Sequence, residues 1–330
     1  MTSIFPQCDK RLIEAINKTE YAIVIAHRNP DGDALYSSLA MERILSKLGK
    51  KTLLLNEGPF LRDDIKKLEP VFRKEADKTF IEKNPLVIIL DCSTPDRPGE
   101  PFKAVSHLQR IVIDHHSSGV PFTEEGMSYI VPQAPSTTLL VDVVREALKV
   151  ELDREIAGYL YRGFATDTGF YHFLSAEAAP ECLRRVAAFT AEGISPYEVY
   201  DEMHDGRKLQ DIKYTASIIQ SAKPLLDGRL IVAYQPETMM NARLSDGVYA
   251  SLLEAENVMV VLFIKDKGDA IEIGLRSKNK AGIDVGAIAS AFGGGGHAKA
   301  AGATLLGKKA EETESLLVES IREAIEKKDS

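Results

Sequence analysis

Four short apolar segments constrain the fold of this chain more than any other feature of its sequence. They are residues 21–26, 52–55, 86–90 and 111–113, and most of their side chains are aliphatic. Strands without polar alternation are buried on both faces, which is typical of a parallel sheet covered by helices. Apolar residues recur at helical spacing over 33–48, 136–148 and 154–165. The sequence therefore predicts an α/β fold whose N-terminal part holds a parallel sheet.

The pattern changes after residue 176, and the length of 330 residues favours more than one domain. Residues 176–222 read as three helical stretches without a convincing strand. Strand signals return at 230–233, 258–264 and 270–275, and helices fit 246–254, 284–291 and 311–327. We predict an N-terminal domain over 1–190, a helical linker over 191–224 and a smaller mixed α/β domain over 225–330.

Composition narrows the classes of function. The formal net charge of −8 argues against a protein that coats long nucleic acid, because such binding needs many Lys and Arg contacts to phosphate. Neither a signal peptide nor a membrane-spanning segment is expected, since no apolar run approaches the ~20 residues that a membrane helix needs. Cys8, Cys92 and Cys182 are widely spaced and form no CxxC motif, which favours a reducing compartment. We expect a cytoplasmic protein that does not bind membranes.

Acidic and imidazole side chains gather where the predicted strands end. In a parallel α/β sheet such residues meet at one edge, the place where these folds bind ligands. Several carboxylates brought together there repel each other unless cations hold them. Oxygen and imidazole donors suit manganese, magnesium, iron or zinc, and the number of donors is enough for two ions roughly 3.5–4 Å apart. The candidate residues are His27, Asp31, Asp33, Asp91, Asp114, His115, His116 and Asp167.

Five sequence motifs resemble those of the DHH phosphoesterases. HRNPDGDALYS, LDCSTPDR, IDHHSS and ATDTGFY resemble the four motifs of the catalytic domain. GLRSKNKAGIDVGAIASAFGGGGHAKAAGATL resembles the signature of the DHH-associated domain. The match runs from about residue 20 to residue 306, and the chain is most similar to the nano-RNase and pAp phosphatase subfamily. The resemblance implies an active site in the cleft between a catalytic and a substrate-binding domain, and a homodimer as one option.

The resemblance also implies a role for each acidic and imidazole residue. His27, Asp31 and Asp91 would hold one ion. Asp33, His115 and Asp167 would hold the second, with Asp91 as a bridge. Both would be manganese, with magnesium as the alternative. His116 would lie near the bridging water or the reacting phosphate, and Asp114 would orient the imidazole of a metal ligand.

A run of four glycines, Gly293, Gly294, Gly295 and Gly296, precedes His297. Such a run is expected where backbone approaches a ligand closely, and exposed N–H groups there would form an anion-binding nest. By the family pattern Arg276 and His297 would bind the far end of the substrate, with Ser277 as a weaker candidate. Arg97 would contact either phosphate or a surface acid. Tyr36 replaces a glycine that is usual in the family, and packing is favoured over stacking on a base.

These features favour an enzyme, a metal-dependent phosphoesterase that hydrolyses short nucleotides such as oligoribonucleotides of a few residues, linear dinucleotides or pAp. A cyclic-dinucleotide phosphodiesterase is the nearest alternative. An exopolyphosphatase or pyrophosphatase is disfavoured by the GGGGH segment, and a full RecJ-type exonuclease by the chain length. A non-catalytic nucleotide-binding regulator ranks last, since all six ligand positions are filled.

Overall fold

The computed structural model describes residues 3–116, 122–237 and 244–329. The chain divides into two compact units, Met1–Asp205 and Gly206–Ser330. The division falls inside the stretch 191–224 that the sequence analysis assigns to a helical linker. Helix α9 (Pro196–His204) belongs to the first unit and helix α10 (Leu209–Ser221) to the second.

A parallel sheet forms the centre of the first unit. Its strand order is β2-β1-β3-β4-β5, and every pair is parallel. The four predicted strands are all present, with one added at the edge. This order reverses between β1 and β3, and such a switch point is where open α/β sheets bind ligands. The strands are β1 (Tyr21–Ala26), β2 (Lys51–Leu55), β3 (Leu86–Leu90), β4 (Arg110–Asp114) and β5 (Ser128–Ile130).

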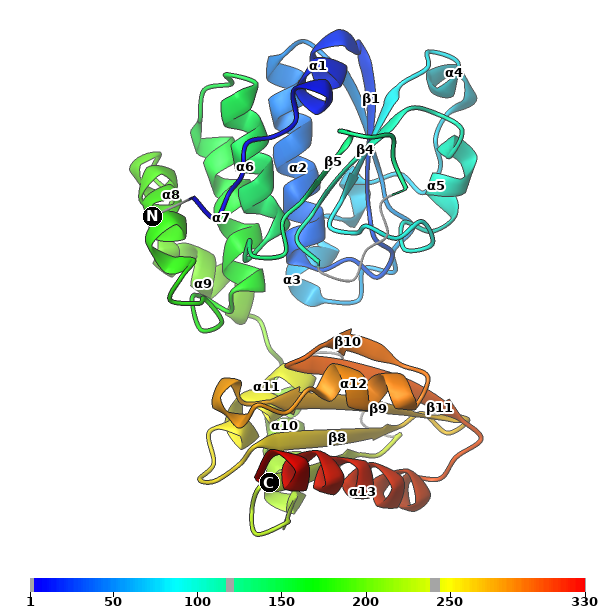
Figure 1. Ribbon diagram of the computed structural model, residues 1–330, viewed down its shortest axis with the longest axis vertical. Helices are drawn as coiled ribbons and strands as arrows, with labels where there is room; N and C mark the ends of the chain where they lie inside the picture. Colours follow the sequence, from blue (N-terminus) through cyan, green and yellow to red (C-terminus); the bar gives the residue numbers. More distant parts are fainter. Residues whose placement is uncertain (1–2, 117–121, 238–243, 330) are drawn as a thin grey trace. The chain divides into compact units, whose positions relative to one another are not determined.

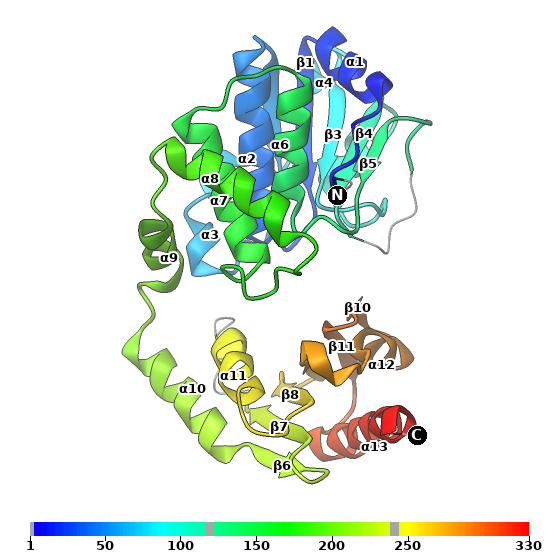
Figure 2. The same cartoon turned by 60° about the vertical axis from the view of Figure 1, so that its left-hand side comes forward.

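Helices cover both faces of this sheet, as the continuous apolar strands require. Successive residues of β1 alternate between two cores: Val24 packs with α1, α2, α6, α7 and α8, whereas Ile25 packs with α4 and α5. Figures 1 and 2 show α2, α6 and α7 together on one side of the strands. The helices are α1 (Lys10–Lys18), α2 (Gly32–Lys47), α3 (Asp63–Lys66), η1 (Glu69–Val71), α4 (Lys78–Ile81), α5 (Glu100–Val105), α6 (Thr137–Ala147), α7 (Arg154–Asp167) and α8 (Ala179–Ala191).

The second unit holds a mixed six-stranded sheet in the order β10-β11-β9-β8-β7-β6. Only β7 and β8 run parallel among these pairs of described strands. The three strands predicted from the sequence are β7, β8 and β9. The set is β6 (Lys223–Leu225), β7 (Leu230–Gln235), β8 (Val260–Asp266), β9 (Ala270–Ser277), β10 (Gly295–His297) and β11 (Ala300–Leu306).

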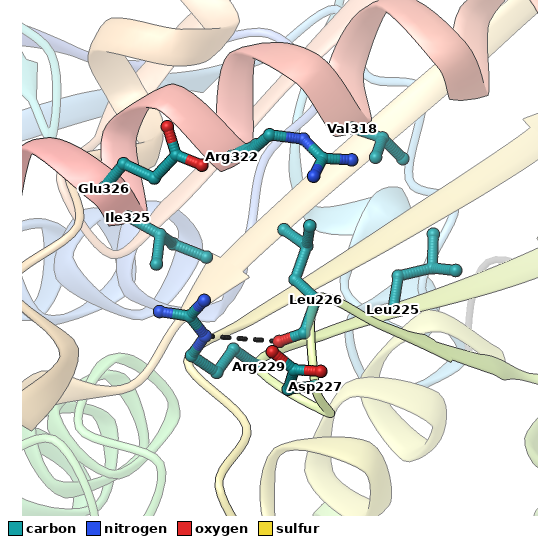
Figure 3. A pocket seen from close by; sticks show the side chains of 8 residues that line it. All are labelled: Leu225, Leu226, Asp227, Arg229, Val318, Arg322, Ile325 and Glu326. Atoms are coloured by element: carbon teal, nitrogen blue, oxygen red, sulfur yellow. Dashed lines mark hydrogen bonds between the residues drawn. The ribbon is translucent and has the colours of Figure 1, made fainter.

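Two separate cores cover the faces of this sheet. Helices α12 (Val285–Ala291) and α13 (Ala310–Asp329) pack on one face, and α10 and α11 (Leu244–Leu253) pack on the other. A cavity of about 420 Å³ lies between the turn joining β6 to β7 and α13, and Arg229 and Arg322 reach into it (Figure 3). None of the site residues predicted from the sequence lines this cavity.

Among residues 3–116, 122–237 and 244–329, no helix is both long enough and apolar enough to cross a membrane.

Candidate metal centre and substrate-binding residues

The switch point of the first sheet brings His27 and Asp91 together. Ala26 and Leu90 are register partners at the ends of the neighbouring strands β1 and β3, so the residues that follow them start from the same edge. Arg28 N–H donates to Arg97 O at 2.8 Å and thereby ties the two loops together. Asn56 Nδ2 donates to the carbonyl oxygen of His27 at 3.0 Å and fixes the first loop from the side of β2.

The six predicted metal ligands converge at this edge. His27 Nε2 lies 3.3 Å from Asp91 Oδ2 and 3.9 Å from Asp31 Oδ1. His115 Nε2 lies 3.1 Å from Asp167 Oδ2 and 3.6 Å from Asp91 Oδ1. Donor atoms within 4.8 Å of one another form three groups that could hold a metal ion, and Asp91 belongs to two of them. The groups are His27–Asp31–Asp91, Asp33–His115–Asp167 and Asp91–His115–His116.

The orientation of two imidazoles fits a bound cation. His27 Nδ1 lies 2.9 Å from Arg28 O, and His115 Nδ1 lies 3.1 Å from Ala134 O. Because a carbonyl oxygen can only accept, each Nδ1 must carry the proton that it donates. In the neutral ring Nε2 then presents a lone pair, and in both residues this atom faces carboxylate oxygens. Lone pairs facing carboxylates need a proton or a cation between them, and a metal ion is one group that could supply the positive charge.

The pKa values of the clustered residues also fit a site for a cation. Burial opposes protonation of His27, but the hydrogen bond to Asp91 and the charges of Asp31 and Asp91 outweigh it and raise the His27 pKa to about 9. Burial and the nearby charges of Asp91 and Asp167 raise the pKa of Asp33 well above its ordinary value. Asp91 itself has a lowered pKa despite its burial, because His27 donates to it and His115 lies close. The metal-free cluster therefore retains protons where a divalent cation would satisfy the carboxylates.

This proton uptake predicts pH-dependent metal binding. The pKa of His27 is about 9 in the folded, metal-free protein and 6.5 in the unfolded chain, so protonated His27 stabilises the folded state. This contribution is complete below pH 6.5 and is lost as the pH rises through 9. Because a metal requires the unprotonated Nε2, Mn²⁺ binding should release protons, and affinity should rise between pH 7 and pH 9 by about tenfold per pH unit for each proton released.

Titration calorimetry in buffers of different ionisation enthalpy measures the released protons directly. The His27→Gln variant should bind Mn²⁺ more weakly and lose the part of the pH dependence that His27 contributes, while the raised pKa of His115 leaves a remainder. A variant at the exposed His107 should match the wild type. An affinity that stays constant from pH 7 to pH 9 would contradict the assignment of His27.

Helix α6 supplies contacts that sequence reasoning missed. Thr137 N–H and Thr138 N–H donate to Asp33 Oδ2 and Oδ1 at 2.6 and 3.0 Å, so the start of the helix holds the carboxylate. Thr137 Oγ1 donates to Asp91 Oδ1 at 2.8 Å. Both threonines are fully buried. The signal in the sequence is the Ser136-Thr-Thr start of a helix, which the pattern identifies only as a cap.

Two glycines allow α7 to approach the centre closely. A Cβ atom placed on Gly163 would lie 2.2 Å from Thr138 Cγ2 and 2.9 Å from Asp33 Oδ1. One placed on Gly32, at the start of α2, would lie 2.7 Å from the Thr166 side chain. The sequence does not show that either position must be glycine, because the atoms that a side chain would clash with belong to a helix distant in the chain.

Asp114 contacts His116, whereas the Nδ1 atoms of the predicted ligands His27 and His115 face main-chain carbonyls. His116 Nδ1 lies 2.8 Å from Asp114 Oδ1, and the same oxygen accepts from His116 N–H at 3.1 Å. Asp114 is fully buried at the end of β4, and its Oδ2 has no hydrogen-bond partner among the described residues. This pair leaves Nε2 as the ring atom of His116 that faces away from Asp114.

Two roles were predicted for each of Tyr36 and Arg97, and their surroundings in the first unit distinguish these roles. Tyr36 is 4% exposed, belongs to the core and stacks on Tyr159 with ring centroids 6.4 Å apart, so it packs as favoured. The side chain of Arg97 is exposed and forms no ion pair with the part of the chain that the structure describes. The surface-acid alternative for Arg97 therefore has no support among these residues.

Only the first half of the glycine run lies outside regular structure, which corrects the prediction of one nest built from all four glycines. Gly293 N–H and Gly294 N–H donate to Ser290 O and Ala289 O at 3.1 and 2.9 Å and close the end of α12. Gly295 and Gly296 belong to strand β10. The four glycines thus do not form one nest of exposed N–H groups. A Cβ on Gly294 would lie 2.1 Å from Gly302 O, and one on Gly296 would lie 2.5 Å from Ala300 O, so close packing against β11 requires glycine at both.

Arg276 and His297 nevertheless share one face of the second sheet. Ala300 is the register partner of both, and partners across a ladder point to the same side. Gly274, Gly302 and Gly295 form the next row on this face, and a Cβ on Gly274 would lie 2.0 Å from the Tyr249 hydroxyl, so glycine there makes room for the Tyr249 side chain. The guanidinium of Arg276 lies 4.7 Å from the ring centroid of Tyr249, a buried residue of α11, and is thereby held in place.

Ser277 points away from this face. It is buried, and its hydroxyl lies within hydrogen-bond distance of Ile283 O and Ala298 O, at 2.9 and 3.3 Å. These contacts give Ser277 a structural role in holding the segment that follows β9.

A parallel sheet with an acid and imidazole cluster at its switch point, followed by a mixed α/β unit, defines a class of metal-binding phosphoesterase. Residues 22–164 match the DHH family N-terminal domain, and residues 227–327 match the DHHA1 domain. The chain belongs to the DHH family of phosphoesterases.

Two named proteins are similar in sequence to nearly the whole of this chain. The bifunctional oligoribonuclease and PAP phosphatase NrnA of Thermus thermophilus is 30% identical over 319 residues, which cover 94% of this chain and 93% of that protein. The cyclic-di-AMP phosphodiesterase GdpP of Geobacillus thermodenitrificans is 23% identical over 96% of this chain and 49% of its own length. The relationship to NrnA extends over nearly the whole of both proteins.

Solved structures share the fold. An exopolyphosphatase-related protein from Bacteroides fragilis matches with a TM-score of 0.82 at 21% identity, covering 99% of this chain and 98% of that one. RecJ of Thermus thermophilus in complex with Mn²⁺ matches with a TM-score of 0.53 at 16% identity, covering 92% of this chain and 53% of that one.

Proposed function

We propose that this protein hydrolyses phosphoester bonds in short nucleotides, namely oligoribonucleotides of a few residues, linear dinucleotides and pAp. The observation that carries the proposal is the full set of six candidate ligands in a chain that aligns end to end with an oligoribonuclease and PAP phosphatase. The acidic net charge of −8 supports a short substrate, because no extended basic track for a long strand is expected.

Two divalent ions, manganese by preference, would be held by His27, Asp31 and Asp91 and by Asp33, Asp91, His115 and Asp167. Bound there, such ions supply Lewis acidity for an in-line displacement at phosphorus. The chain's own residues fix the donors: the start of α6 holds Asp33, and main-chain carbonyls orient His27 and His115. Little reorganisation is then needed when substrate binds.

His116 is the proposed proton carrier. Its Nδ1 is engaged with Asp114, so Nε2 is the atom that can give a proton to the leaving oxygen. Arg97, exposed in the loop after β3, would bind a phosphate of the substrate. Arg276 and His297 would bind the other end of the nucleotide on the face of the second sheet that they share, and this would favour short substrates over long ones.

An assay with Mn²⁺ on four substrates tests the proposal: a linear diribonucleotide, pAp, a cyclic dinucleotide and inorganic pyrophosphate. We expect turnover of the diribonucleotide and of pAp. Preference for the cyclic dinucleotide would favour the activity named for GdpP, to which this chain is similar over 96% of its length. Hydrolysis of pyrophosphate alone would refute the role given to Arg276 and His297.

A further inference from the structure

The segment after Asp167 has an unusual backbone. Gly169, Phe170 and Tyr171 all have positive φ, at 52°, 49° and 76°. Left-handed backbone costs a residue with a side chain roughly 1–2 kcal/mol, so two consecutive aromatic residues in this region need compensating contacts. Strain of this kind gathers where a structure must hold a side chain in one particular place.

Two of the four aromatic side chains in this segment are anchors. The Phe170 ring packs edge-on against Tyr200 with centroids 4.9 Å apart, and the Tyr171 hydroxyl lies 3.1 Å from that of Tyr161. Main-chain bonds tighten the turn further: Phe170 N–H donates to Ala165 O at 2.9 Å. These contacts hold the backbone rigidly on the end of α7.

The other two side chains, His172 and Phe173, point outward. Phe173 is 63% exposed, although the backbone that carries it is held by the contacts of Phe170 and Tyr171. Its N–H donates to Thr168 O at 2.9 Å, and its ring lies so close to Gly169 that a Cβ there would be 2.8 Å from Phe173 Cε2. The His172 ring meets it edge-on at 4.8 Å and 82°. These contacts cover part of the Phe173 side chain, and most of it remains exposed.

The position of this ring determines what it can bind. Thr168, which accepts from Phe173 N–H, follows the candidate metal ligand Asp167 directly in the chain. An exposed aromatic ring on the turn that follows Asp167 is suited to a nucleobase, because bases stack on aromatic side chains. We propose that Phe173, oriented by His172, stacks on the base next to the scissile phosphate and so determines that the substrate is a nucleotide. This inference rests on the proposed function.

The test compares variants of the full chain in Mn²⁺ with 5′-phosphorylated diadenylate, diuridylate and an abasic ribose dinucleotide. Loss of one stacked base is worth about tenfold in binding, so Phe173→Ala should raise KM for diadenylate about tenfold and leave kcat nearly unchanged. The increase should be smaller for diuridylate, which offers less stacking area, and absent for the abasic substrate. Phe173→Tyr should behave as the wild type. Tyr197→Ala, which removes another exposed aromatic residue of the same unit, is the matched control.

The experiment distinguishes failure of the proposed function from failure of the stacking proposal. If wild-type protein does not hydrolyse diadenylate, the proposed function fails. If it does and Phe173→Ala has the wild-type KM, only the stacking contact is refuted. An equal loss on the abasic substrate, or a loss of Mn²⁺ affinity, would show that Phe173 only supports the turn and would also overturn the inference.

Discussion

Exchange of Asp91 for asparagine is expected to lower kcat/KM by at least about a thousandfold, because a lost metal ligand removes several kcal/mol of transition-state stabilisation. Asp91 is the one described residue that joins the His27–Asp31 pair to His115 and His116. Its two carboxylate oxygens face opposite partners, Oδ2 toward His27 and Oδ1 toward His115. An amide offers only one oxygen, so it cannot serve both sides.

Asparagine is the right substitution because of the backbone at this position. Asp91 has a φ of 60°, in the left-handed region that asparagine and aspartate tolerate better than other residues with side chains. Alanine would add backbone strain and confuse loss of metal with loss of stability. Thermal unfolding of metal-free Asp91→Asn should therefore confirm a folded protein, and elemental analysis should show reduced Mn²⁺.

Asp96→Asn is the matched control for this experiment. Asp96 is exposed and lies in the same loop after β3, so its exchange removes an equal charge without removing a ligand. We expect wild-type activity from it. A fully active Asp91→Asn variant would refute the assignment of the centre.

The second large effect is expected from a single methyl group. Gly163→Ala would place a Cβ 2.2 Å from Thr138 Cγ2 and 2.9 Å from Asp33 Oδ1. Both neighbours are fully buried and cannot give way freely. Overpacking of this kind costs about 1–3 kcal/mol, and the displaced group is a candidate ligand. We expect a lower melting temperature, weaker Mn²⁺ binding and at least about a tenfold loss of activity, since small displacements of catalytic groups have such effects.

Gly158→Ala in the same helix separates packing from helix propensity. A Cβ there would lie 3.1 Å from Arg162 Nη1, the end of a flexible side chain, and 3.5 Å from Ile194 Cδ1. Alanine improves a helix interior by up to about 1 kcal/mol over glycine, so this variant should keep its activity and at least its stability. If Gly163→Ala behaves like Gly158→Ala, the close approach of α7 to Asp33 is not needed.

The parallel sheet and the clustering of its strand-end residues were predictable from the sequence. A strand such as Leu86–Leu90 consists of aliphatic residues only, so its burial follows from its composition. Parallel strands end at one common edge of the sheet, which predicts that His27, Asp91 and His115 lie together. Strands without a compositional signal were missed. Strands β5, β6 and β10 have only three residues each, too few for a period, and β11 begins with the small residues Ala-Ala-Gly-Ala.

The sequence by itself determined which chemical groups are present and which strand each one follows, because both are written in residue types and local spacing. Only the tertiary structure decided what surrounds them. Thr137 holds Asp91 across 46 residues, and Gly163 leaves room for Asp33 across an interface between helices. The tertiary structure also decided that Gly293 and Gly294 close the end of α12 and that Gly295 and Gly296 belong to β10. Gly294 and Gly296 must be glycine because a side chain there would clash with β11. Such requirements arise from contacts between distant segments, and no local pattern records them.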